Sequence, residues 1–171
     1  MKKFRFLLAF GLSLALLFVT CSCSEKIPPS CRDILAAMTS SEAGLPAGRV
    51  YSAMAEAGES EFLDDSLLAA LYGGGSLPDV SEDWLDCAVF LPSSSHPCEL
   101  AVFLCSSHDA ASDTARLLCS RLRSLKNAKS TCEEFSLMLE SASVTICGNF
   151  VLFIVSSDTQ NSLKIAKSLI S

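Results

Sequence analysis

The sequence predicts an α+β fold: a four-stranded antiparallel sheet with two helices packed on one of its faces, preceded by N-terminal helices. The prediction rests on the order and the hydrophobic patterns of the segments. From residue 84 onward, two closely spaced apolar runs precede an amphipathic helix, and the same strand-strand-helix order then occurs again. Such a repeated unit places all four strands in one antiparallel sheet and packs its helices against that sheet.

The first unit spans residues 84–130. Apolar runs at 84–92 and 98–107 are separated by a short loop, so an antiparallel hairpin is the simplest pairing. The helix expected at 108–130 has one apolar stripe, acidic residues early and basic residues late, an order that complements the helix dipole.

The second unit contains a tight hairpin and a terminal helix. Gly148 and Asn149 form a two-residue connection suited to a type II′ turn. The strand that follows, 150–155, is apolar at every position, which predicts a central strand covered on both faces. Residues 131–141 are expected to be a short helix or an irregular run. In the closing helix, the inward side is expected to carry Leu163, Ala166, Leu169 and Ile170.

Two helices are expected before the sheet. Residues 31–44 place Ile34, Leu35 and Met38 on one helical face, and 62–75 form a leucine-rich helix with Asp64 or Asp65 as its N-cap. The segment between them is expected to be a loop with possible short structure. We therefore expect one α+β domain at 31–171, with its core at about 62–171.

The N-terminus has the pattern of an export signal. Basic residues at 1–5 precede 14 largely apolar residues at 6–19, which are fewer than the roughly 20 that span a bilayer. We expect a lipoprotein signal peptide at 1–22, a lipidated tether at 23–30, and a mature protein on the outer face of the cytoplasmic membrane. A retained short transmembrane anchor is the alternative.

Two cysteines, Cys21 and Cys23, follow the apolar run. Ser22 is a small residue immediately before Cys23, which makes Cys23 the expected lipidation site and Cys21 the second choice. Thr20 stands where lipoprotein signals usually have leucine. A zinc site would need a second pair of ligands at a suitable spacing, and a disulfide between cysteines one residue apart is geometrically awkward. The lipid would make the membrane a partner of the protein.

The charge of the chain excludes nucleic acid as a partner. Loss of residues 1–22 removes Lys2, Lys3 and Arg5, leaving 10 basic and 19 acidic residues and changing the net charge from -6 to -9. An acidic domain repels phosphate backbones.

Seven further cysteines and two histidines are the candidates for reactive chemistry. An odd number leaves at least one thiol unpaired in the monomer, and burial as small hydrophobic side chains is the main interpretation, with disulfides as the next. His96, Cys98, Cys105 and His108 are weak metal candidates, because Cys98 and Cys105 lie roughly 23 Å apart at the two ends of one strand. Cys105 with His108 is also a weak candidate nucleophile pair. We expect no resident metal and no cofactor.

Several stretches resemble a family of small bacterial lipoproteins catalogued as domain of unknown function 4358. They are the helix end "LAALYGGG", the passage "CELAVFLCSSHDAASDTARLLCSRL" and the ending "GNFVLFIVSSDTQNSLKIAKSLI". The resemblance covers roughly 31–171, with Phe150 where the family has tyrosine and a compact 126–135 segment where the family has a longer one. It implies a lipid-anchored extracytoplasmic domain and no particular reaction.

These features together predict a non-catalytic binding or assembly module of the cell envelope, whose partner is an envelope protein or a small ligand. The contact surface is expected at the open sheet edge or on the sheet face away from the helices. The alternative is a thiol-based redox or metal-handling lipoprotein, suggested by the cysteine count. Hydrolase activity is a more distant third hypothesis.

Overall fold

The computed structural model describes residues 28–129 and 133–171, which form an α+β domain. Its elements, in chain order, are α2 (Cys31–Ser41), β1 (Gly48–Ser52), α3 (Asp65–Tyr72), the 3₁₀ helix η1 (Asp79–Asp83), β2 (Trp84–Pro92), β3 (Glu99–Cys105), α4 (His108–Lys129), α5 (Glu133–Ser141), β4 (Ser143–Cys147), β5 (Phe150–Val155) and α6 (Thr159–Ile170). The predicted signal peptide and both candidate lipidation sites, Cys21 and Cys23, lie outside the described residues, as does Cys132.

The sheet has five strands, in the order β1-β2-β3-β5-β4, and every neighbouring pair is antiparallel. The prediction of an antiparallel α+β sheet is confirmed, but the predicted number of four strands is wrong. The extra strand is β1, in the segment for which the sequence predicts a loop with possible short structure. The apolar pattern of β1 is weak because β1 is an edge strand. Its partner β2 holds it in place through residue pairs such as Val50 with Phe90.

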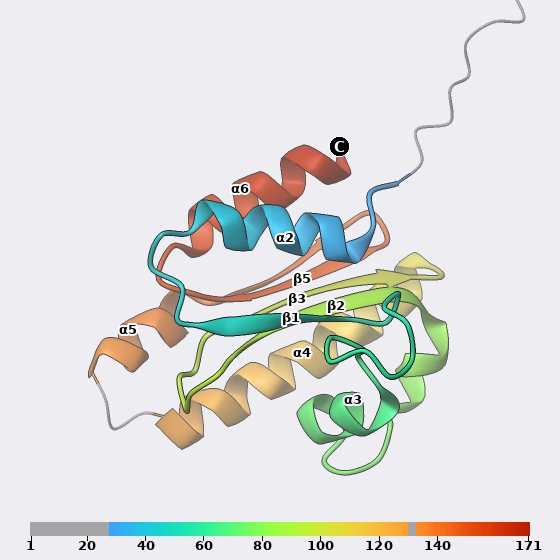
Figure 1. Cartoon of the computed structure of the whole chain (residues 1–171), viewed down its shortest axis with the longest axis horizontal. Coiled ribbons are helices and arrows are strands. Elements are labelled where there is room, and N and C mark those ends of the chain that lie inside the picture. The colour runs from blue at the N-terminus through green and yellow to red at the C-terminus, as the bar shows by residue number, and fades with distance from the viewer. Residues whose placement is uncertain (1–27, 130–132) are drawn as a thin grey trace, which may run out of the picture.

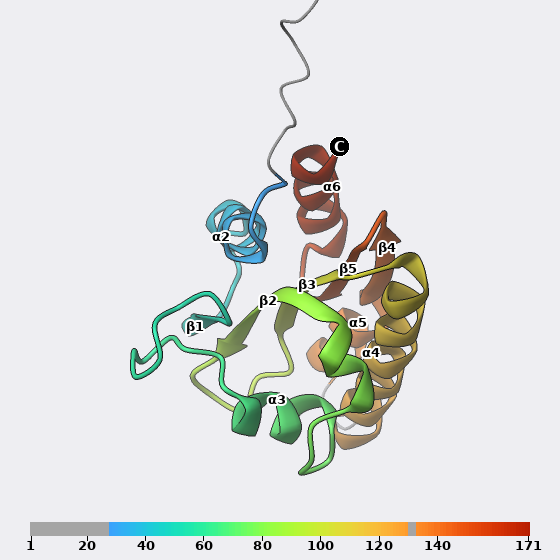
Figure 2. The same cartoon turned by 90° about the vertical axis from the view of Figure 1, so that its right-hand side faces the viewer.

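Helices cover both faces of the sheet, not one. Figures 1 and 2 show α2 and α6 side by side over one face, and α3, α4 and α5 over the other. The physical reason is the burial of the central strands. All six residues of β5 are buried, and six of the seven in β3 are buried, so both of their faces need an apolar cover.

Both predicted hairpins are present. β2 pairs with β3, with an irregularity in register between Trp84 and Asp86, and β4 pairs with β5 so that Cys147 lies opposite Phe150. Gly148 begins the β4–β5 turn with φ of 60°, a conformation that glycine adopts without steric cost.

The helix starts follow the expected capping chemistry. The Asp64 side chain accepts a hydrogen bond from the Leu67 N–H at 2.8 Å, so Asp64 rather than Asp65 is the N-cap of α3. Residues 133–141 form the helix α5, one of the two expected alternatives. In α6 the expected inward position of Leu169 is wrong, since its side chain is 41% exposed.

The core begins earlier than the expected residue 62. Four residues of α2 are fully buried against the sheet and α6: Cys31, Ile34, Leu35 and Met38. No helix among the described residues is long and apolar enough to span a bilayer.

Candidate functional site

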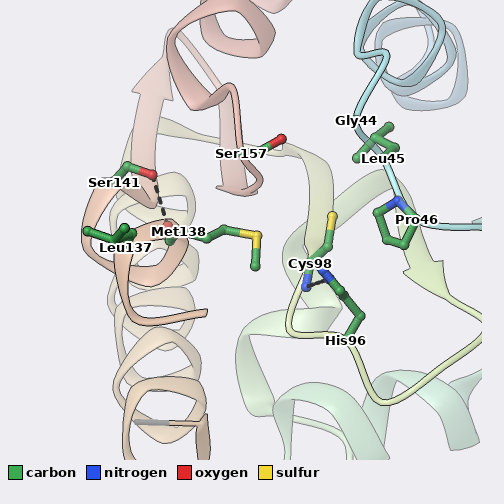
Figure 3. A pocket seen from close by; sticks show the side chains of 9 residues that line it. All are labelled: Gly44, Leu45, Pro46, His96, Cys98, Leu137, Met138, Ser141 and Ser157. Carbon is green, nitrogen blue, oxygen red and sulfur yellow. Dashed lines mark hydrogen bonds between the residues drawn. The ribbon is translucent and has the colours of Figure 1, made fainter. Parts of the chain in front are cut away.

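A pocket of about 390 Å³ lies at one end of the sheet, where four segments meet. It is formed by the α2–β1 connection, the β2–β3 loop, the last turns of α5 and the residues between β5 and α6 (Figure 3). The described residues that line it are Gly44, Leu45, Pro46, His96, Cys98, Leu137, Met138, Ser141 and Ser157. Its volume falls within the range of pockets that hold small molecules, about 300–1,000 Å³.

Most of the pocket wall is apolar. Leu45 and Pro46 approach from the α2–β1 connection, and Leu137 and Met138 from α5. Figure 3 shows the Met138 side chain extending from α5 toward Cys98, so a thioether and a thiol both belong to the wall. Leu137 is 64% exposed although it is a large apolar side chain, which places hydrophobic surface at the pocket's rim.

His96 is held in one orientation within the pocket wall. Its Nδ1 atom accepts a hydrogen bond from the backbone N–H of Cys98 at 3.1 Å, and its ring packs edge-on against Phe135 with 5.0 Å between ring centroids. Because Nδ1 is the acceptor, the neutral ring carries its proton on Nε2. The neutral ring in the pocket wall therefore has a single N–H donor, at Nε2.

Ser157 connects the pocket to a buried carboxylate. Its hydroxyl donates to Oε1 of Glu42 at 3.3 Å. The Glu42 carboxylate, on a side chain that is 7% exposed, also accepts from the Asp158 N–H at 3.1 Å and from the Ser162 hydroxyl at 2.8 Å. A negative charge therefore lies one hydroxyl group behind the pocket wall, tying the end of α2 to the start of α6.

The thiol in the wall is held in its protonated form. The pKa of Cys98 is raised to about 12, first by burial and then by the nearby Glu42 and Glu99 carboxylates. Burial likewise raises the pKa of Cys87 to about 12, and it raises the pKa values of Cys31 and Cys105. The thiolate is the reactive form, so these four side chains behave as buried apolar groups near neutral pH.

The structure separates the four weak metal candidates. His96 and Cys98 both line the pocket, whereas Cys105 is the last residue of β3, at its other end, and His108 is the first residue of α4. Cys105 is fully buried and its Sγ lies 3.5 Å from Oγ1 of Thr114, while His108 is exposed at the start of α4. Within residues 28–129 and 133–171, no three histidine, cysteine or acidic side chains are grouped as a metal site would require.

The cysteines in the described part of the chain are all unpaired. Four are buried, Cys147 is half-buried and Cys119 is exposed on α4. Burial of thiols as small hydrophobic groups, the main interpretation from the sequence, matches the first four.

Sequence reasoning missed most of the pocket. Leu45, Met138 and Ser157 carry no motif, and they come from segments far apart in the chain. One signal was available: Glu42 is an acidic residue at the end of a helix, where the dipole disfavours negative charge. Such a position indicates that a partner elsewhere in the fold compensates for the carboxylate.

Comparisons of the chain with protein-family models, with curated proteins and with solved structures found no match. The family resemblance therefore stays a prediction from the sequence, and the function is argued from the pocket.

Proposed function

We propose that this protein is a lipid-anchored, non-catalytic binding module of the bacterial cell envelope, which holds a small molecule in the pocket beside Met138 and Cys98. The observation that carries the proposal is the pocket itself. A volume of about 390 Å³, a mostly apolar wall and a few fixed polar groups are the usual features of a small-molecule site.

The direction of α2 supports an anchored arrangement. The described chain begins next to the start of α2, and the helix runs from there toward the end of the domain where the pocket-lining segments lie (Figure 1). Gly44, three residues after the end of α2, lines the pocket. Eleven helical residues span about 16 Å. The described chain thus enters the domain at the end away from the pocket, an arrangement compatible with a lipid on Cys23, the residue favoured by the N-terminal sequence.

The raised thiol pKa values favour binding over thiol chemistry. A redox or metal-handling protein needs thiolates near neutral pH, and burial opposes their formation at Cys31, Cys87, Cys98 and Cys105. No observation on the described residues favours the alternative function over the pocket.

The proposal is tested with 2-phenylethanol, a neutral probe with an apolar body. The protein is labelled with ¹³C at its methionine methyl groups and titrated by NMR. We expect the Met138 methyl signal to shift saturably, while Met54, which is 69% exposed and outside the pocket, does not. Equal shifts of both signals, or no shift of Met138 at millimolar probe, would contradict the proposal.

A matched pair of variants controls for surface hydrophobicity. Leu137 and Leu85 have nearly equal exposed fractions, 64% and 63%, but only Leu137 is among the residues lining the pocket. Leu137→Ser should weaken probe binding several-fold because it removes apolar wall, and Leu85→Ser should leave binding unchanged. The same loss in both variants would indicate nonspecific adsorption.

A further inference from the structure

The geometry points to a ligand that carries an amine or ammonium group on an apolar body, with that group directed toward Ser157 and the ends of α2 and α5. This inference rests on the proposed function and specifies the class of ligand. The charge near the pocket and the hydrogen-bond acceptors in its wall determine this class.

Both hydroxyl groups in the pocket wall donate their hydrogen atoms to acceptors within the protein. Ser157 donates to Glu42, and Ser141 donates to the backbone carbonyl of Met138 at 2.9 Å (Figure 3). Each oxygen is then left with lone pairs, which accept but do not donate. A ligand with N–H groups satisfies both oxygens, whereas a carboxylate or phosphate finds no hydroxyl hydrogen free at either of them.

Two helix C-termini adjoin the pocket and add negative partial charge. Gly44, Leu45 and Pro46 follow the end of α2, and Leu137, Met138 and Ser141 belong to the last turns of α5. A basic side chain commonly offsets the C-terminal dipole, but the last turns of these two described helices contain none. A cationic group bound in the pocket would offset the two helix dipoles as such a basic side chain does.

Besides the N–H donor of His96, the start of α6 is a feature that would favour an anion, but two side-chain carboxylates already occupy it. Helix N-termini attract negative charge, but here Glu42 accepts from the Asp158 N–H, and the Asp158 side chain accepts from the Asn161 N–H at 3.2 Å. Two carboxylates thus occupy this end of α6, and a third negative group would be repelled.

The electrostatic environment of Cys98 has the same sign as these contacts. After burial, the Glu42 and Glu99 carboxylates are the next causes of its raised pKa, so they oppose a negative charge at its Sγ. Glu99 is paired with Arg121 at 2.8 Å, which leaves Glu42 as the carboxylate beside the pocket without a basic partner among the described residues. The same potential stabilises a positive charge.

Three probes with one aromatic body and different head groups test the inference: 2-phenylethylamine in its ammonium form, 2-phenylethanol and phenylacetate. Dissociation constants are measured from the Met138 methyl shift at pH 7.5 and low salt. We expect the ammonium form to bind at least about tenfold more tightly than the alcohol, and phenylacetate to bind more weakly than the alcohol.

Glu42→Gln removes the charge and keeps the side-chain shape, so it should reduce the preference for ammonium over alcohol to about threefold or less. The methyl signal of Met38, buried beneath α2, reports whether the variant keeps its fold. Ser157→Ala is a second variant: it should weaken ammonium binding while Glu42 stays in place. An unchanged preference in both folded variants would contradict the role given to these side chains.

The two proposals fail differently in this experiment. If none of the probes shifts the Met138 methyl signal, both the proposed function and the inferred class of ligand are contradicted. If 2-phenylethanol binds but the ammonium form binds no more tightly, or phenylacetate binds best, the binding function stands and the inference is overturned.

Discussion

Among single residues, the buried carboxylate of Glu99 depends most on its hydrogen-bonding and ionic partners. Its side chain is 3% exposed, and it accepts from Arg121 and from the hydroxyl of Tyr72 at 3.0 Å. Arg121→Met should lower the free energy of unfolding by roughly 2–4 kcal/mol, because it leaves a buried charge without its cationic partner. Urea denaturation with an unchanged m-value measures the loss.

The control for this prediction lies on the same helix. Arg116 pairs with Asp113 on the surface of α4, where the two side chains are 79% and 52% exposed. Arg116→Met should change stability by less than about 0.5 kcal/mol, since exposed ion pairs contribute little. Similar losses for Arg116→Met and Arg121→Met would show that burial does not govern the effect.

Buried thiols predict a loss of stability at alkaline pH. In the folded protein the pKa of Cys87 is raised from 9.0 to about 12, first by burial and then by Asp86 and Cys105. Between these values the unfolded chain releases a proton that the folded protein keeps. Stability is therefore complete below about pH 9 and falls as the pH rises toward 12, by up to about 1.4 kcal/mol per pH unit for each such thiol.

Urea midpoints measured from pH 7.5 to 10.5 test this slope. Cys87→Ala should make the alkaline decline shallower, while Cys119→Ala, at an exposed position on α4, should leave the decline as it is. A wild-type midpoint that stays constant over this range would contradict the protonated, buried state of these thiols.

At the scale of elements, the β4–β5 turn depends on the conformation of one residue. Gly148 has φ of 60°, and a Cβ added there would meet no atom within 4 Å, so any cost of substitution is conformational. Gly148→Ala should destabilise the protein by about 1–2 kcal/mol. Gly148→Asn should cost less, because asparagine tolerates left-handed backbone, and thermal unfolding of the two variants decides the order.

The elements that the sequence predicts well are those with strong local patterns. Apolar periodicity and the Asp64 cap define α3, and the continuous apolar run of β5 indicates a central strand, as found. β1 is different: a Cβ on Gly48 would lie 2.5 Å from the Leu91 carbonyl oxygen, so this strand is shaped by its partner rather than by its own propensity.

The pocket could not be predicted for a related reason. Residue type alone indicates His96 and Cys98 as candidates. Their neighbours Leu45, Met138 and Ser157 are brought together by the strand order and by the positions of α2 and α5 on opposite faces. Local sequence patterns contain no information on such distant neighbours. Glu42 is likewise explained only when α6 is placed beside the end of α2.

At the scale of the whole molecule, the three layers limit where partners can bind. Helices cover both faces of the sheet, so the open sheet face expected as a contact surface is absent from the described structure. The edges remain, at β1 and β4. The segments that line the pocket lie at the end of the sheet away from the start of α2 (Figure 1), and the pocket is the better-defined site.

We propose that a lipid-anchored domain presents this pocket outside the cell, and the intact mass of the protein purified from membranes under native conditions tests this anchor. We expect the mass of residues 23–171 with a diacylglyceryl group on Cys23, because the residues around Ser22 resemble a lipoprotein cleavage site. A chain that keeps residues 1–22, or one that carries no lipid, would contradict the anchor.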